Sequence, residues 1–338
     1  MRVGVEYMPG ANVGDGIYQL SVLGLMQTAF PNAEVMRVDG PLFKTFPNRP
    51  HLVARTRLAG RGFEITPYYD LDCLCFSGPI LGDDFIQSYG PAIRAVRDRG
   101  GSYLIVSAHC PAYSETLIDF FRREPPLAIS TRDTPSYVAL SSCDAPVYDG
   151  VCAALLVSQT CRPPSISTAL GPYITVSCDK GFEPHLSFAL DEAGEVDLDT
   201  IDVGHYEGKS KWRYIRHLEF ARPVASSVAE CQIIRPVHDI SYKFSHLNFA
   251  KAQAFLSYLP ESYLALYRST RLTVSDRVHS CAPTLSYGKP AVFIGDTPRA
   301  AIFDRVGAIA GSNGVMKVDL TTIEKEYDAL LEWFRSIL

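Results

Sequence analysis

Short apolar segments alternate with helical segments along most of the chain, and this alternation limits the fold more than any other feature of the sequence. Most of these segments end in a turn that contains Gly, Ser, Asp or His. The clearest are Arg2–Glu6, Glu34–Val38, Leu71–Phe76, Tyr103–Ser107, Tyr173–Ser177 and Ala291–Gly295. Apolar strands separated by helices are typical of parallel sheets buried on both faces. The sequence therefore predicts an α/β fold with mainly parallel sheets.

A polar stretch broken by Pro and Gly, residues 158–172 (SQTCRPPSISTALGP), divides the alternation into two halves. At 338 residues the chain is also long for a single core. We therefore expect two Rossmann-like domains, residues 1–160 and 161–320. Residues 321–338 form an amphipathic helix that starts at a capping box of Thr321 and Glu324, and it can pack back on the first domain.

The second half is less regular than the first. Residues 179–212 are acidic and poorly periodic, which indicates loops and a possible hairpin. Apolar patterns predict strands over 213–219 and 231–236 and helices over 247–258 and 260–269.

The composition excludes several classes of protein. Hydrophobic residues make up 47% of the chain and charged residues 20%, which is typical of a globular protein. The net charge of −5 argues against a general nucleic-acid binder. The N-terminus (MRVGVEYMPG) lacks the apolar segment of a signal peptide, and no apolar run approaches the ~20 residues that cross a bilayer. We expect no integral membrane segment.

The nine cysteines are scattered without the spacing of a disulfide framework. This usage indicates reduced thiols in a cytoplasmic protein. The sequence contains neither C-x-x-C nor H-E-x-x-H, so we expect no metal site.

The segment Arg271–Gly295 combines the most chemically suggestive features. It reads as a strand over Arg271–Ser275, a helix that ends at Gly288, and a second strand over Ala291–Gly295. Ser275 and Asp276 are typical helix caps, which places Arg277 and His279 at the helix N-terminus. A helix N-terminus attracts anions, a guanidinium binds phosphate or carboxylate, and His exchanges protons near neutral pH. An ion-paired Arg and a capping His are the alternative.

Other strand ends carry further candidates. The loop after the first strand contains Asn12, Gly14 and Asp15, in which Asn12 or Asp15 can cap the next helix and Gly14 lets backbone approach a ligand. Gly78 follows Leu71–Phe76, and His109 follows Tyr103–Ser107, at the edge where open α/β sheets bind ligands.

The fourth strand end, over residues 127–130, is followed by Arg132 and Asp133. Thr134 would then cap a helix with Pro135 at its first position. Tight turns and caps are the structural alternative at all of these positions.

Taken in order, four patches resemble the polysaccharide pyruvyl transferase family over about residues 10 to 295. They are ANVGDGIYQLSVLGL (family pattern N-x-G-D, then a helix), DCLCFSGPILGDD (a strand, then glycines), ISTRDTPSYVAL (S-x-R-D-x-x-S-x-x-x-L) and SDRVHSCAPTLSYGKPAVFIG (R-L-H, then G-x-P and a strand). The chain departs from the family pattern at Pro79, at Val278, at Pro283 and at VYDGV, where the family often has a D-P pair.

The resemblance implies a fold similar to the GT-B glycosyltransferases, with two domains facing a cleft. It also implies transfer of the enolpyruvyl unit of phosphoenolpyruvate onto a sugar or lipid-linked saccharide of a surface polysaccharide precursor, which forms a pyruvate ketal. By this resemblance Arg132 and Arg277 bind the phosphate and carboxylate of the donor. His279 matches the R-L-H histidine and would act as the general acid that protonates the methylene carbon.

The remaining candidates are substrate-binding residues in this scheme, and it requires no metal or organic cofactor. They are Asn12, Gly14, Asp15, Gly78, His109, Asp133 and Ser280. Asp15 or Asp133 would orient a base or a sugar hydroxyl, although both also suit helix capping. Two alternatives remain: a GT-B-like glycosyltransferase that uses a nucleotide sugar, and a non-catalytic member that binds sugars or anions. The sequence specifies neither the acceptor sugar nor the oligomeric state.

Overall fold

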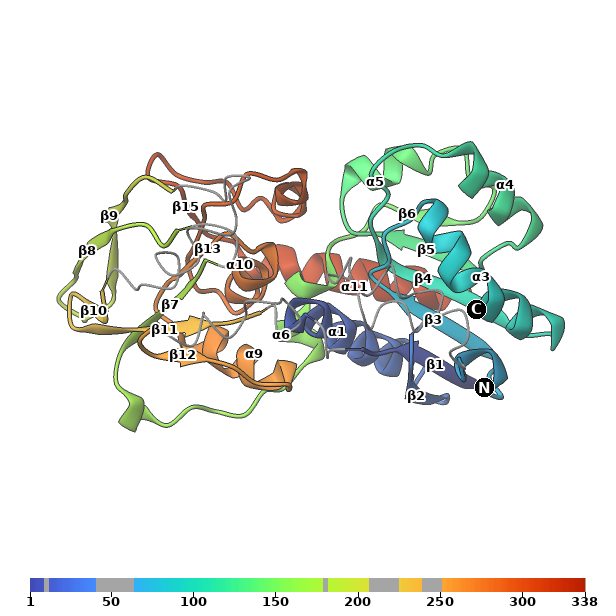
Figure 1. Ribbon diagram of the computed structural model, residues 1–338, viewed down its shortest axis with the longest axis horizontal. Coiled ribbons are helices and arrows are strands. Elements are labelled where there is room, and N and C mark those ends of the chain that lie inside the picture. Colours follow the sequence, from blue (N-terminus) through green and yellow to red (C-terminus); the bar gives the residue numbers. More distant parts are fainter. Residues whose placement is uncertain (9–11, 41–63, 179–181, 207–224, 239–250, 338) are drawn as a thin grey trace, which may run out of the picture. The chain divides into compact units, whose positions relative to one another are not determined.

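The computed structural model describes residues 1–8, 12–40, 64–178, 182–206, 225–238 and 251–337 (Figure 1). The chain forms two compact units. Unit 1 contains residues 1–11, 15–161 and 321–338, and unit 2 contains residues 12–14 and 162–320. Each unit is built on its own sheet. The predicted α/β class with two mainly parallel sheets is confirmed.

Unit 1 contains a six-stranded sheet in which all described pairs of neighbouring strands are parallel. Its order is β2-β1-β3-β4-β5-β6. The strands are β1 (Arg2–Glu6), β2 (Glu34–Val38), β3 (Cys73–Ser77), β4 (Ser102–Ala108), β5 (Ala128–Thr131) and β6 (Val147–Tyr148). The chain leaves β1 for β2 on one side and then adds β3 on the other side. The strand order therefore reverses between β1 and β3.

Helices cover both faces of this sheet. The described residues of unit 1 form the helices α1 (Val13–Ala29), α3 (Asp83–Asp98), α4 (Glu115–Arg123), α5 (Thr134–Ala139), α6 (Val157–Thr160) and α11 (Leu320–Ile337), with short 3₁₀ turns η3 (Thr66–Tyr68) and η4 (Ala153–Leu155). Phe85 of α3 and Phe121 of α4 pack with Phe76 of β3 in one buried aromatic cluster. Because right-handed crossovers run in opposite directions from β1, α1 lies on the other face (Figure 1).

The C-terminal helix α11 belongs to unit 1 although it follows unit 2 in the chain. The Trp333 ring packs in a tilted arrangement on Tyr148 of β6, with the ring centroids 5.0 Å apart, and Arg335 donates to the Thr28 carbonyl at the end of α1. Phe334 is fully buried. The helix begins at Leu320, so Thr321 lies inside its first turn instead of capping it.

Unit 2 has a mixed seven-stranded sheet with a parallel centre and antiparallel edges. The parallel strands are β7 (Tyr173–Ser177), β11 (Cys231–Pro236), β12 (Ala254–Phe255), β13 (Thr273–Ser275) and β14 (Ala291–Phe293), and the antiparallel strands are β10 (Ser227–Val228) and β15 (Val315–Met316). From β7 the chain first adds strands on the β11 side and then returns to add β13. The order therefore reverses at β7.

The two faces of the second sheet are covered differently. A hairpin of β8 (Leu186–Leu190) and β9 (Val196–Val203) packs Leu186, Phe188 and Ile201 against β7, β11 and β13. Helix α9 (Pro260–Ser269) packs on the strands through Leu266, which lies in one buried cluster with Tyr173 of β7 and Ile234 of β11. Helix α10 (Val278–Ser286) packs in turn against α9. Shorter 3₁₀ turns are η5 (Thr168–Leu170), η6 (Pro298–Ile302) and η7 (Asp304–Val306).

Several local predictions need correction. Asp133, not Thr134, caps α5 by accepting from the Ser136 N–H, and Pro135 is the second helical residue. Arg277 occupies the N-cap position of α10, which was predicted for Ser275 or Asp276. Residues 254–255 form β12 and not part of a helix. The strand predicted over 213–219 lies outside the described residues.

Candidate functional site

The candidate residues gather at the carboxyl ends of the two sheets, where the strand order reverses. In parallel α/β sheets the helices before and after a reversal lie on opposite faces, and this leaves a crevice beyond the strand ends. In unit 1 the reversal lies between β1 and β3, which end at Glu6 and Ser77. In unit 2 it lies at β7 and β13, which end at Ser177 and Ser275.

Asp133 is the centre of the polar network in unit 1. Its Oδ1 accepts from the Ser136 N–H at 2.8 Å and from the Ser136 hydroxyl at 2.5 Å. Its Oδ2 accepts from Arg132 Nε at 3.2 Å and lies 3.5 Å from His109 Nδ1. Burial alone would raise the pKa of Asp133, but His109, Ser136 and Arg132 outweigh that effect and hold the pKa well below its usual range. The carboxylate is therefore ionised at any physiological pH.

Arg132 is a buried cation with unused hydrogen-bonding capacity. The residue is 6% exposed, and its Nη2 has no hydrogen-bond partner among the described residues. Ser77 Oγ, at the end of β3, is likewise buried and without a partner in the described part of the chain. Buried polar atoms are almost always paired, so these two are candidates for contact with a bound ligand.

The beginning of α1 brings Tyr18 to the same edge. A Cβ atom at Gly78 would lie 2.4 Å from the Tyr18 ring, so Gly78 (φ +59°) is the residue that lets the ring pack on this loop. Burial raises the pKa of the Tyr18 phenol, with Asp15 and Glu6 raising it further and Arg132 opposing them. These interactions join two predicted residues, Asp15 and Arg132, to Tyr18 and Glu6.

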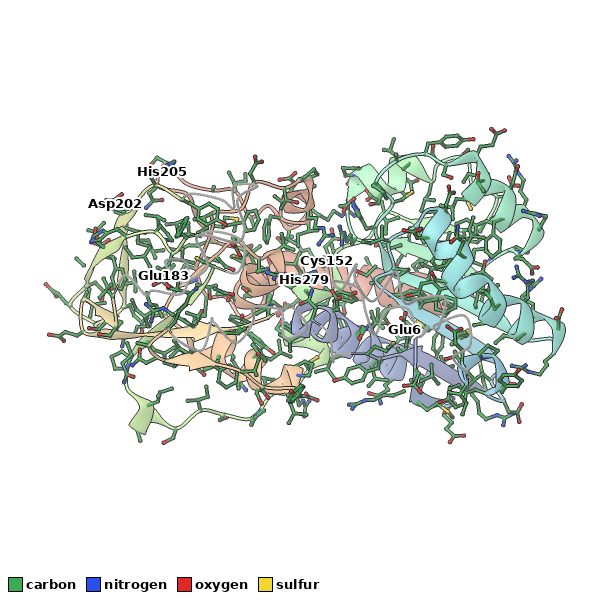
Figure 2. All side chains as sticks on the ribbon, in the orientation of Figure 1. Glu6, Cys152, Glu183, Asp202, His205 and His279 are labelled. Carbon is green, nitrogen blue, oxygen red and sulfur yellow. The ribbon has the colours of Figure 1, made fainter. Side chains whose placement is uncertain are left out.

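Glu6 is 1% exposed at the end of β1 and accepts from the Tyr89 hydroxyl at 3.0 Å (Figure 2). Neither Glu6 nor Tyr18 was predicted as a site residue. A charged residue that ends an otherwise apolar strand was the available signal for Glu6. Tyr18 gave none, because an aromatic residue in an amphipathic helix is typical of a core.

In unit 2 the predicted pair Arg277 and His279 lies at the start of α10, with both residues half-buried. His279 is labelled in Figure 2. Arg277 N–H donates to Ser275 Oγ at 2.9 Å, and the Ser275 hydroxyl donates to the Ser177 carbonyl at 2.7 Å. These bonds tie the helix start to the reversal at β7. The arrangement directs the positive end of α10 and a guanidinium to the carboxyl edge of the sheet.

The N-terminal loop contributes to unit 2 and not only to unit 1. Asn12 Oδ1 accepts from the Gly14 N–H at 3.0 Å, so Asn12, rather than Asp15, caps α1. The Val13 N–H donates to the His238 carbonyl at 3.0 Å. A Cβ atom at Gly14 would lie 3.2 Å from both Cβ and Nδ1 of His279. Two patches separated by more than half of the chain therefore meet.

Asp276 and Tyr206 add a further polar pair that the sequence analysis did not assign to the site. The Tyr206 hydroxyl donates to Asp276 Oδ2 at 2.7 Å. Burial and the neighbouring Asp276 raise the pKa of Tyr206 strongly, while Arg277 opposes the shift. Tyr206 follows the hairpin in the segment for which no function was predicted.

Ser280 has a different environment from its predicted neighbours. It is fully buried, lies 3.2 Å from His238 Nε2, and accepts from the Tyr267 hydroxyl at 3.2 Å. His238 Nε2 also pairs with the Tyr267 hydroxyl. The three side chains hold the segment after β11, helix α9 and helix α10 together.

Among the described residues, no helix is both long enough and apolar enough to cross a membrane. No group of three or more His, Cys, Asp or Glu side chains in this part of the chain has the arrangement of a metal site. All nine cysteines are free thiols, and most are buried.

Several solved structures have a similar course of the chain. A UDP complex of MnaA from S. aureus gives a TM-score of 0.49 at 8% identity, covering 99% of this chain and 89% of that one. UDP-GlcNAc 2-epimerase from Neisseria meningitidis, bound to UDP-GlcNAc, gives 0.44 at 13% identity, covering 100% and 94%. ADP-heptose lipopolysaccharide heptosyltransferase II from E. coli gives 0.36 at 10% identity, covering 98% and 99%. At these TM-scores and identities, the similarity supports no conclusion about the substrate of this protein.

No curated protein sequence matches the chain. The sequence pattern of the family described as polysaccharide pyruvyl transferase, however, matches residues 12–297. This match covers well over half of the chain and includes the four patches quoted above apart from Ala11. It begins at Asn12, which caps α1, and extends beyond the strand that follows α10. The chain therefore belongs to the polysaccharide pyruvyl transferase family.

Proposed function

We propose that this protein transfers the pyruvyl group of phosphoenolpyruvate to a saccharide and forms a cyclic pyruvate ketal. Family membership supports the reaction class. The observation that carries the proposal is the contact of the Asn12–Gly14 turn with His279, because it joins an acid–base residue to a family motif at a cationic helix start.

Phosphoenolpyruvate carries a phosphate and a carboxylate, and the chain offers two guanidinium groups to bind them. Arg277 lies at the positive end of α10, and Arg132 has a buried Nη2 without a partner in the described residues. Guanidinium groups bind both kinds of anion by paired hydrogen bonds. Either guanidinium can therefore neutralise one of the two anionic groups of the donor.

His279 is the general acid of the proposed reaction. Its imidazolium donates a proton to the methylene carbon of the donor, which becomes a methyl group and leaves an oxocarbenium-like centre at the neighbouring carbon. A saccharide hydroxyl attacks that centre, and the C–O bond to phosphate then breaks with its electron pair leaving on phosphate. A second hydroxyl closes the ketal. One hydroxyl proton replaces the proton lost by His279, and the other leaves with phosphate.

The proposed acceptor is a sugar or lipid-linked saccharide of a surface or exopolysaccharide precursor. The proposed location is the cytoplasm, where phosphoenolpyruvate is made. The nine free thiols support a reducing compartment.

Thermal unfolding with phosphoenolpyruvate tests the donor. A ligand that binds only the folded protein stabilises it by about 2.7 kcal/mol at a hundredfold excess over its Kd. We expect a rise in the unfolding midpoint for the wild type and none for Arg277→Ala. Arg268→Ala, which changes an exposed residue on α9, is the matched control and should keep the rise. Stabilisation by a panel of nucleotide sugars, and not by phosphoenolpyruvate, would contradict the proposal and favour glycosyl transfer.

A further inference from the structure

We infer that His109 is the general base of the reaction and takes the proton of the attacking saccharide hydroxyl on its Nε2 atom. This inference rests on the proposed function, which assigns no base to the attacking hydroxyl. The geometry around the imidazole ring of His109 carries it.

The two neighbours of His109 Nδ1 are both acceptors. Asp133 Oδ2, at 3.5 Å, belongs to an ionised carboxylate and can only accept. Ser136 Oγ, at 3.2 Å, has a single hydrogen, which it donates to Asp133 Oδ1 at 2.5 Å. Its oxygen also accepts from the Cys110 N–H at 3.0 Å, so the remaining lone pair faces Nδ1.

This arrangement sets the tautomer of the neutral ring. Because both neighbours of Nδ1 are acceptors, Nδ1 holds the proton and Nε2 holds the basic lone pair. No described residue pairs with Nε2. The side chain of His109 is 17% exposed, so a ligand can reach the ring.

The backbone of His109 is also held on both sides. Its N–H donates to the Pro79 carbonyl at 2.9 Å, and its carbonyl accepts from the Leu81 N–H at 2.7 Å. The loop after β3 therefore fixes the main chain, while Ser136 and Asp133 fix the ring. A carboxylate beside a histidine holds the imidazole in one tautomer and orientation and stabilises the imidazolium that forms when the ring accepts a proton.

Arg132 places this base beside an anion site. Its Nε donates to the same Asp133 Oδ2 atom, and its Nη2 is the buried donor without a partner in the described residues. One carboxylate thus orients both a cation for the substrate and a base. The charged and titratable groups near His109 are Asp133, Arg132, and the thiols of Cys110 and Cys152. Burial raises the pKa values of both thiols.

The proton balance closes with this assignment. His109 accepts the proton of the first hydroxyl as its oxygen bonds to the donor carbon. The imidazolium then gives that proton to the departing phosphate. Neutral again, His109 accepts the proton of the second hydroxyl during ring closure and releases it to solvent.

The first test compares His109→Gln with Ser136→Ala, and uses His185→Gln, at an exposed histidine, as the control. Transfer from phosphoenolpyruvate is measured on p-nitrophenyl glycosides of galactose, glucose, mannose and N-acetylglucosamine. We expect His109→Gln to lower kcat by roughly 10²–10⁴-fold and to remove the acidic limb of the pH profile. Ser136→Ala should lower kcat less and keep that limb, and stabilisation by phosphoenolpyruvate should persist in both variants. Full activity of His109→Gln, or loss of donor binding in it, would overturn the inference.

The second test reads the ring directly and does not require turnover. Nitrogen-15 NMR of the wild type distinguishes a protonated Nδ1 from a protonated Nε2 in the neutral ring. We expect the Nδ1–H form, with an Nε2 resonance that shifts when a reactive glycoside from the panel is added without donor. A protonated Nε2 would overturn the assignment even if transfer is observed. If phosphoenolpyruvate supports no transfer at all, the proposed function fails. The role of His109 as a base is then tested independently, by this spectrum and by assaying His109→Gln with nucleotide-sugar donors.

Discussion

At the scale of single residues, the contact between Gly14 and His279 connects the two motifs most closely tied to the proposed chemistry. Sequence spacing could not show it, because the two residues are 265 positions apart (279 − 14) and only folding brings them together. The residue types were nevertheless informative. A glycine beside a helix cap indicated a close approach, and the approaching group is the imidazole itself.

Gly14→Ala tests this contact. The new Cβ would lie 3.2 Å from His279 Nδ1 and 3.1 Å from Asn12 Oδ1, closer than most Cβ contacts, so we expect the imidazole to move. Because small misplacements of a catalytic group reduce rates steeply, kcat should fall by about tenfold or more. The free energy of unfolding should change little, since Ala favours the helix. Steady-state kinetics and urea unfolding give the two values, and unchanged kcat would argue against His279 as the acid.

Asp133 makes a prediction about pH. Because its pKa is depressed in the folded protein, its contribution to stability is complete above the unfolded pKa of about 3.9 and is lost as the pH falls toward the folded pKa. Asp133→Ala should therefore cost about 1–2 kcal/mol at pH 7, through loss of the cap, and less at pH 3. Urea unfolding at both pH values measures the difference. The exposed Asp98→Ala variant should show no such trend, and a cost for Asp133→Ala that does not depend on pH would contradict the assignment.

At the scale of elements, the sequence predicted the parallel strands and most helices because apolar periodicity reports burial directly. The helix starts were less accurate, since Thr134, Asp133, Ser275 and Asp276 all have capping side chains and only the folded geometry selects among them. The β8–β9 hairpin was only a possibility, because its acidic outer face hides the apolar alternation that packs on β7.

Helix α1 depends on a close approach to α6, and two glycine substitutions separate this effect from helix propensity. A Cβ at Gly24 would lie 2.4 Å from the Thr160 carbonyl oxygen, whereas one at Gly90 of α3 meets only the flexible Arg94 guanidinium at 3.3 Å. We expect Gly24→Ala to destabilise unit 1 by about 1–3 kcal/mol and Gly90→Ala to stabilise it by about 0.5–1 kcal/mol. Chemical unfolding measures both. Equal effects would show that α1 can shift away from Thr160.

At the scale of the whole molecule, the chain crosses between its units more often than a sequence boundary suggests. Residues 12–14 belong to unit 2, and α11 returns to unit 1 after unit 2 is complete. The periodicity of α11 predicted a helix, but its partner, Tyr148 on the edge strand β6, has no counterpart in local sequence. The chain length and the polar stretch at 158–172 indicated two domains, whereas long-range packing determines which residues each unit contains.

The most direct test of the central claim is product analysis with purified protein. Phosphoenolpyruvate and the p-nitrophenyl glycoside panel are incubated with the wild type, His279→Gln and the His185→Gln control, and the glycosides are examined by mass spectrometry while inorganic phosphate is assayed. We expect the wild type and the control to add one pyruvate ketal to a glycoside for each phosphate released, and His279→Gln to lose this activity by roughly 10²-fold or more. Phosphate release without ketal, or ketal formation at the wild-type rate in His279→Gln, would contradict the account.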